Sequence, residues 1–138
     1  MAVTRARVFE YRVDTGPDWT AKSDRGGAEL YRDEAWTPEH LVLAGLARCT
    51  LQSLEYHAHG AGLEATATVV TRGSVTRRES DGRFAFVDIS ASLELEVEPR
   101  PDPDALRQLV AKAERDCFVG ASLTPKPVYT WTIAGEEL

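Results

Sequence analysis

The sequence predicts an α+β fold in which antiparallel strands pack against one long, buried helix. The clearest observation is the alternation of Phe84–Glu98, where apolar and polar residues take turns from Val87 onward. The second is an apolar helical run that starts at Thr37-Pro38. The third is that the helical patterns are separated along the sequence from the strands, which are joined to one another as hairpins, an arrangement typical of this fold class. A length of 138 residues suits a single domain over 1–138.

The N-terminal segment predicts a hairpin. Ala6–Val13 is rich in Val, Phe and Tyr and reads as a strand, and Asp14–Asp18 (Asp-Thr-Gly-Pro-Asp) is a strong turn signal. Trp19–Ser23 would be the partner strand, and a short extended piece would follow over 28–32.

The central helix is expected from Pro38 to about His59. Thr37 supplies an N-cap hydroxyl, and Gly60 and Gly62 end the pattern. At 100° per residue only one narrow stripe is polar, which predicts a largely buried helix with one wet edge. The stripe consists of Arg48, Gln52, Glu55 and His59.

The remaining elements follow in order. Leu63–Arg78 and Phe84–Glu98 would form a long hairpin. Asp102 and Pro103 predict the start of a second helix, whose apolar stripe continues to Cys117. The last strand is expected over 128–133.

Composition narrows the function. A net charge of −6 argues against binding to nucleic acid or to an anionic membrane, both of which need a basic face. The chain has neither an apolar run long enough to span a bilayer nor the apolar stretch of a signal peptide, so we expect a cytoplasmic protein. In that reducing compartment paired cysteines are more often catalytic, redox-sensing or metal-binding than structural.

The two cysteines are the candidate reactive groups. Each one alone reads more readily as a small apolar packing residue, because Cys49 lies within a helix and Cys117 extends an apolar stripe. A reactive thiol needs a cation, a base or a helix N-terminus nearby. Cys49 is expected in mid-helix, and Arg48 points about 100° away from it around the helix. A zinc site is disfavoured, since two distant cysteines and three scattered histidines do not make four converging ligands.

The combination is more specific. Segment 37–50 (Thr-Pro-Glu-His-Leu-Val-Leu-Ala-Gly-Leu-Ala-Arg-Cys-Thr) resembles the signature helix of the OsmC/Ohr family, the osmotically inducible and organic hydroperoxide resistance proteins. A Pro-Glu pair opens that helix, and a cysteine follows the glutamate by ten positions, as Cys49 follows Glu39. A second cysteine at the end of a later helix corresponds to Cys117, and the order of elements agrees over nearly the whole chain.

The resemblance implies a thiol-dependent peroxidase for organic hydroperoxides, without metal or cofactor. Cys49 would be the peroxidatic thiol and Cys117 the resolving thiol, with an external dithiol, lipoyl in Ohr-type members, as reductant. It also implies an intertwined homodimer with its sites at the subunit interface. Glu39 would pair with an activating arginine from the loop joining the first two strands. Loop 14–18 has no arginine, so Arg25 is the candidate and Arg12 the alternative, and Phe118 stands where a proline often follows the resolving cysteine.

How Glu39 could reach Cys49 stays open, and so do two alternative functions. Glu39 and Cys49 would lie about 15 Å apart along one straight helix, so any contact needs a break in the helix or a second subunit. One alternative is a hot-dog thioesterase, also a sheet around one helix, with Glu55 as its acid. The other is a non-catalytic OsmC-like module that binds a small apolar ligand.

Overall fold

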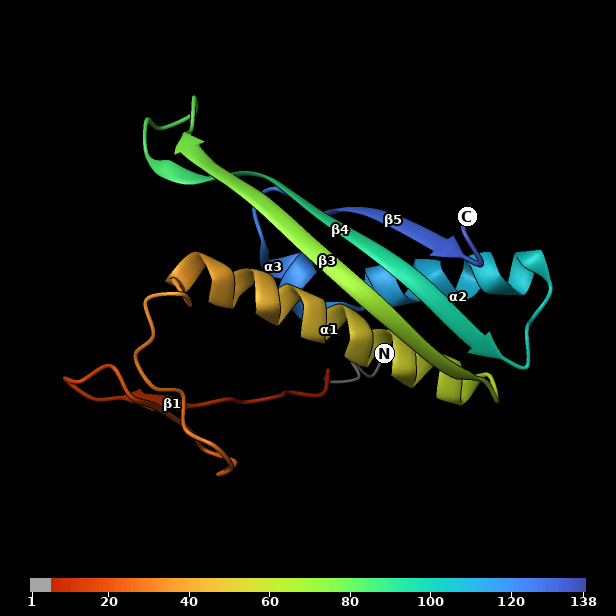
Figure 1. The fold of residues 1–138 in the computed structure, drawn as a ribbon, viewed down its shortest axis with the longest axis horizontal. Coiled ribbons are helices and arrows are strands. Elements are labelled where there is room, and N and C mark those ends of the chain that lie inside the picture. Colours follow the sequence, from red (N-terminus) through yellow and green to blue (C-terminus); the bar gives the residue numbers. More distant parts are fainter. Residues whose placement is uncertain (1–5) are drawn as a thin grey trace, which may run out of the picture. The chain divides into compact units, whose positions relative to one another are not determined.

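The computed structural model describes residues 6–138, which form two compact units. One unit extends to Thr37 and the other is Pro38–Leu138. The prediction of a single domain stays a prediction. Most of the helices and strands are labelled in Figure 1.

The N-terminal unit holds a short hairpin. Strand β1 (Val13–Thr15) pairs antiparallel with β2 (Ala21–Ser23), as the turn signal between them predicts. The predicted strand over 6–13 is wrong except for its last residue, because 6–12 have no strand partner among the described residues. A β-rich composition does not form a strand without a neighbour to pair with.

Helix α1 (Pro38–Gly60) begins and ends almost where the sequence indicates. Gly62 has φ 73 and follows the last turn, a conformation that favours glycine. Only one face of α1 is buried, so the prediction of a largely buried helix is wrong for this chain taken alone. Apolar side chains on the other face are exposed, namely Leu41, Val42 and Tyr56.

A four-stranded sheet covers the buried face of α1. Its order is β3 (Glu64–Arg77), β4 (Phe84–Glu98), β5 (Val128–Ile133) and β6 (Glu136–Glu137). The long β3–β4 hairpin is confirmed. The sheet is not wholly antiparallel, because β5 pairs with β4 in parallel. The helical segment between these strands carries the chain back along the sheet, and such a crossover is what joins parallel neighbours.

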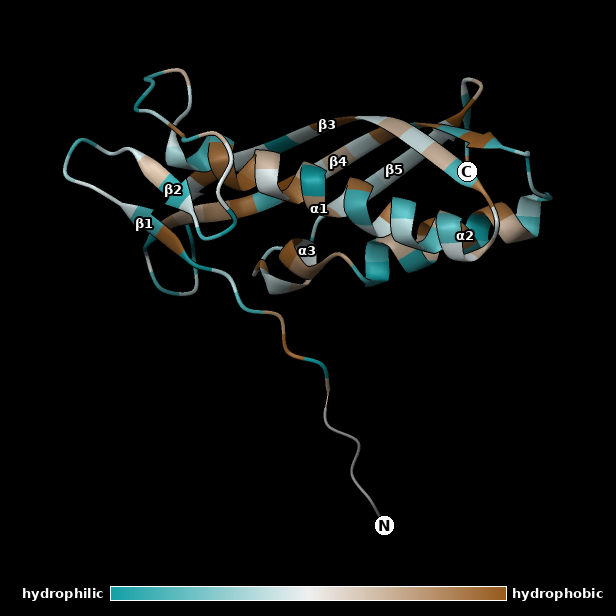
Figure 2. Ribbon diagram, turned by 90° about the horizontal axis from the view of Figure 1, so that it is seen from below, coloured by the Kyte–Doolittle hydropathy of each residue, from teal (hydrophilic) through white to brown (hydrophobic). Residues whose placement is uncertain are grey.

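The helices α1, α2 (Pro103–Arg115) and α3 (Phe118–Ser122) all lie on one side of the sheet, seen from below in Figure 2. Asp102 caps α2 by accepting a hydrogen bond from the backbone N–H of Ala105 at 2.9 Å, as predicted. The main core fills the space between the sheet and α1 and α2. Its members include Leu54, Leu93, Leu95, Leu106, Leu109, Trp131 and Ile133.

A β-bulge changes the alternation at one end of β4. Ser74 pairs with Asp88 but Val75 pairs with Phe86, so Val87 is the extra residue. Val87 is therefore exposed, against the prediction that it faces inward, and Phe86 packs inward instead. The ring of Phe86 occupies the place of a side chain at Gly73, where a Cβ would lie 2.7 Å from it.

Removing part of the core of β4 should destabilise the protein. Leu93 is 1% exposed, so Leu93→Ala should lower the free energy of unfolding by about 2–5 kcal/mol, measured by urea denaturation. Val70, on β3, is 50% exposed, and Val70→Ala should cost less than about 1 kcal/mol. Equal losses in the two variants would contradict this account of the core.

Candidate functional site

Cys49 lies on α1 where the helix meets α3. It is half-buried and packs against a small cluster made of Leu46, Ile89 and Cys117. Its Sγ accepts a hydrogen bond from the backbone N–H of Val119 at 3.4 Å. The predicted position on the shoulder between wet and apolar faces agrees with this partial burial.

The apolar stripe predicts that Cys117 is the last residue of the second helix, and this prediction is wrong. Helix α2 ends at Arg115, and Cys117 is the N-cap of α3, with a fully buried side chain. The stripe is correct about burial and wrong about the element, because the chain turns at Asp116 and starts a new short helix. The Cys117 Sγ accepts a hydrogen bond from the backbone N–H of Gly120 at 3.4 Å.

The fold brings the two thiols together although they are far apart in sequence. Both are free, and consecutive backbone N–H groups of α3, those of Val119 and Gly120, each donate to one of the two sulfurs. The two side chains also interact directly, since Cys117 affects the ionisation of Cys49 through a hydrogen bond and through charge. The segment that carries Cys117 thus also supplies a donor to Cys49.

The electrostatics of Cys49 oppose its ionisation within this chain. Burial raises the pKa of the Cys49 thiol above its ordinary value. The hydrogen bond from Val119 acts in the opposite direction, and the hydrogen bond and negative charge of Cys117 raise the pKa further. The largest effects on this pKa come from burial, Val119 and Cys117 rather than from a cation. The arrangement positions the thiol but does not by itself activate it.

Within the second unit, no other predicted site residue lies next to Cys49; the other candidates are Glu39, Arg25 and Arg12. Glu39 lies in the exposed first turn of α1, and the helix is unbroken between the two residues, so about 15 Å separates them. Arg25 belongs to the N-terminal unit, where its guanidinium lies 5.5 Å from the ring centre of Tyr11. Arg12 is paired with Asp14 at 3.0 Å in the same unit.

Three polar neighbours of Cys117 are absent from the sequence-based predictions. Thr50 is fully buried, and its hydroxyl lies 3.5 Å from the Cys117 Sγ. The Tyr129 hydroxyl, on β5, is buried beside the same sulfur. The third neighbour is the N–H of Gly120. Thr50 follows Cys49 directly, which is a weak signal, and nothing in the sequence links Tyr129 to either thiol.

A charged cluster ties α1 to the residue before Cys117. His57 Nε2 lies 2.7 Å from the Asp116 carboxylate, which also accepts hydrogen bonds from Arg115. The Arg115 guanidinium, with a contribution from His57, lowers the pKa of Asp116 to about 2. Asp116 is therefore ionised at all physiological pH values.

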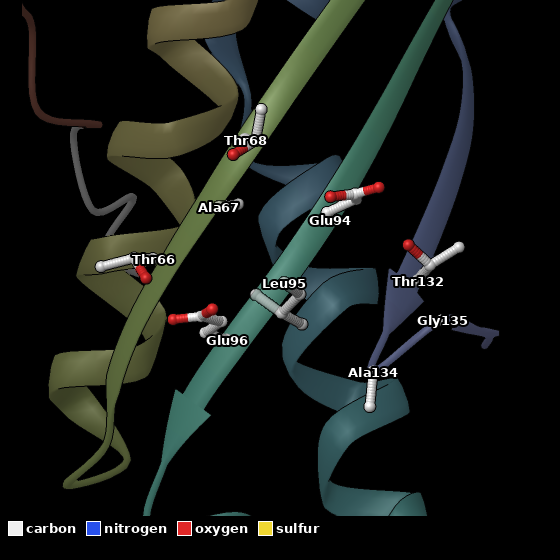
Figure 3. A pocket seen from close by; sticks show the side chains of 9 residues that line it. All are labelled: Thr66, Ala67, Thr68, Glu94, Leu95, Glu96, Thr132, Ala134 and Gly135. Carbon is white, nitrogen blue, oxygen red and sulfur yellow. The ribbon is translucent and has the colours of Figure 1, made fainter.

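No group of three or more His, Cys, Asp or Glu residues in 6–138 is arranged to hold a metal ion. Within the same range no helix is both long and apolar enough to cross a membrane. A hollow of about 410 Å³ lies on the outer face of the sheet, lined from β3, β4, β5 and the turn after β5 (Figure 3). Its polar lining consists mainly of Thr66, Thr68, Glu94, Glu96 and Thr132, and it contains neither cysteine.

Solved structures with the same fold include three bacterial proteins. The OsmC-like protein from Mycoplasma pneumoniae has a TM-score of 0.70 and 19% identity, covering 94% of this chain and 99% of that one. The organic hydroperoxide resistance protein OhrB of Bacillus subtilis has a TM-score of 0.59 and 20% identity, covering 90% and 96%. An organic hydroperoxide resistance protein OsmC from Legionella pneumophila has a TM-score of 0.57 and 17% identity, covering 94% and 98%.

Among curated proteins, none has a sequence that matches this chain. The family model described as OsmC-like protein matches residues 31–132, a range that takes in α1, both cysteines and most of the sheet. The match decides against the hot-dog alternative, whose acid Glu55 is moreover exposed on α1. Because the matched range is well over half of the sequence, the chain belongs to the OsmC-like protein family.

Proposed function

We propose that this protein is a thiol-dependent peroxidase that reduces organic hydroperoxides. The observation that carries the proposal is the pair of free thiols, one half-buried and one fully buried, that meet under adjacent N–H groups of α3. Two of the structural relatives bear names that refer to organic hydroperoxide resistance, which supports this choice of substrate class.

In the proposed reaction Cys49 is the peroxidatic residue. Its thiolate attacks the terminal oxygen of the hydroperoxide, so that an S–O bond forms and the O–O bond breaks. The alkoxide leaves with a proton as an alcohol, and Cys49 becomes a sulfenic acid. The N–H of Val119, which donates to the thiol sulfur, favours the charged form before the attack.

Cys117 is the resolving residue. Its sulfur attacks the sulfur of the Cys49 sulfenic acid, forming the disulfide and releasing the oxygen as water. An external dithiol, of the lipoyl class, then reduces the disulfide and is itself oxidised. Enclosing Cys117 fully keeps it from reacting with the hydroperoxide in place of Cys49.

The activating cation is assigned to Arg25 and the working unit to a homodimer. The unbroken helix separates Glu39 from Cys49 of the same chain, so in this proposal Glu39 acts at the site of a second copy. The exposed apolar side chains of α1, Leu41 and Val42, would be covered at the interface. The raised pKa of Cys49 favours the alternative of a non-catalytic module binding an apolar ligand, if no cation reaches the thiol.

Single-turnover oxidation tests the roles of the two thiols. Cumene hydroperoxide should give a Cys49–Cys117 disulfide in the reduced protein, detected by mass spectrometry, with continued peroxide consumption when a dithiol is supplied. Cys49→Ser should abolish consumption, because the attacking sulfur is gone. Cys117→Ser should stop at a sulfenic acid on Cys49 that dimedone traps. Hydroperoxide that leaves both thiols unchanged would refute the proposal and leave the ligand-binding alternative.

The pH dependence of Cys49 oxidation tests Arg25. Without a cation, the burial-raised pKa leaves little thiolate at neutral pH, and the rate climbs about tenfold per pH unit below that pKa. Arg25→Met should therefore slow oxidation at pH 7, with the difference from the unchanged protein narrowing toward pH 9.5, measured by stopped flow. Arg12→Met removes a charge from the same unit and should leave the profile unchanged. A shift in Arg12→Met alone would reassign the cation.

The oligomeric state tests the interface. The protein should sediment at twice the mass of the 15.2 kDa chain. Val42→Asp should shift it toward the monomer, because a carboxylate in an apolar interface loses its hydration. Gln108→Glu adds a charge at an exposed position of α2 and should not change the mass. A monomeric unchanged protein would contradict the assignment.

A further inference from the structure

Tyr129 has a buried hydroxyl whose hydrogen bond is not made. Its ring stacks on Trp131 with centroids 6.4 Å apart, which holds the side chain in the β5 side of the core. Among the described residues the Tyr129 Oη is shielded from solvent and has no hydrogen-bond partner. A buried hydroxyl without a partner costs free energy, so its position calls for a role that the reduced protein does not display.

The unmade bond points toward Cys117. A Cβ placed on Gly120 would lie 2.8 Å from the Tyr129 Oη and 3.3 Å from the Cys117 Sγ. The hydroxyl and the sulfur therefore approach the same small space, which stays open because Gly120 has no side chain. Burial above all, and then the charge of Cys117, hold the pKa of Tyr129 above its usual range, while the nearby Thr50 hydroxyl acts in the opposite direction, so the hydroxyl keeps its hydrogen.

The hydrogen bonds that Cys117 makes as a thiol leave the Tyr129 hydroxyl available to donate to the Cys117 thiolate. The Thr50 hydroxyl donates its one hydrogen to the Leu46 carbonyl at 2.9 Å. Thr50 therefore accepts from the thiol S–H of Cys117, and the N–H of Gly120 donates to the same sulfur. Loss of the thiol proton removes the bond to Thr50 and adds negative charge. The free donor beside the sulfur is then Tyr129.

We propose that Tyr129 is a positioning residue for the resolving step, donating a hydrogen bond to the Cys117 thiolate. The proposal rests on the proposed peroxidase function. The thiolate forms an S–S bond with Cys49 as the S–O bond of the sulfenic acid breaks, and the Cys117 proton leaves with that oxygen in water. During reduction the dithiol attacks Cys49, the S–S bond breaks, and the electron pair returns to Cys117. Tyr129 stabilises this sulfur in both directions.

Tyr129→Phe tests the hydroxyl while keeping the ring that stacks on Trp131. Reduced protein is mixed with one equivalent of cumene hydroperoxide, quenched at successive times, and analysed by mass spectrometry for Cys49 sulfenic acid and disulfide. We expect unchanged oxidation of Cys49 and disulfide formation slowed about tenfold at pH 7. The defect should shrink as the pH rises and ionisation no longer needs the donor. A merely structural role would slow both steps, or slow the second by the same factor at every pH.

The matched control is Tyr31→Phe, which removes a phenol hydroxyl from an exposed side chain. It should leave both rates unchanged. Gly120→Ala fills the space between the Tyr129 hydroxyl and the sulfur, so it should reproduce the slow resolution of Tyr129→Phe. Equal disulfide rates and pH profiles in Tyr129→Phe and the unchanged protein would overturn the inference.

A second oxidant, diamide, tests the role of Tyr129 independently of the proposed peroxidase activity. Diamide adds to the Cys49 thiolate at its N=N bond, and Cys117 then displaces the hydrazine to form the same disulfide. If cumene hydroperoxide fails and diamide still gives a disulfide that Tyr129→Phe slows, the peroxidase proposal falls and the role of Tyr129 stands. If diamide gives no Cys49–Cys117 disulfide, or forms it at equal rates, the role of Tyr129 falls.

Discussion

The burial of one face of β4 is the constraint on which the rest of the second unit depends. Every second residue from Ile89 to Val97 is buried, and α1 and α2 share the task of covering this row. The sheet therefore needs both helices on the same side, and the helical segment of α2 and α3 returns along the sheet to place β5 next to β4. That return path is what delivers Cys117 to the flank of α1. The meeting of the thiols is a consequence of covering the strand.

The short helix α3 gives the site its chemical character. Had α2 simply continued, Cys117 would sit within a helix whose N–H groups are already bonded to carbonyls. The break at Asp116 frees the N–H groups of Val119 and Gly120, which turn to the two sulfurs. The bond between His57 and Asp116 fixes where the break occurs relative to α1. Positioning of the two thiols is therefore local to the second unit, and the neighbours that shift the pKa of Cys49 most, Val119 and Cys117, position it without supplying a cation.

Much of this was predictable from short-range patterns. The alternation of β4, the start of α1 at Pro38 and the Asp102 cap depend on neighbouring residues, and the structure confirms them. The family was also recognisable, from the resemblance of segment 37–50 and from the placement of the two cysteines. The parallel pairing of β5 and the proximity of Tyr129 to Cys117 depend on contacts between distant segments, which periodicity does not encode. The predicted strand over 6–13 failed for the same reason, since residues 6–12 have strand composition without a strand neighbour.

The bulge at Val87 divides β4 into two regions: before it even-numbered residues face the helices, and after it odd-numbered residues do. Odd-numbered residues from Ala91 onward fill the main core, whereas Phe86, an even-numbered residue, reaches the cluster around the thiols. The cluster around the thiols therefore takes one side chain from each side of the bulge, Ile89 in phase with the core and Phe86 out of phase with it. Changes of side-chain volume at Phe86 or at its seat on Gly73 alter the surroundings of the cysteines without shifting the register of the core. One inserted residue thus lets a single strand present a second side chain, Phe86, to the thiols in addition to the one that its buried row supplies.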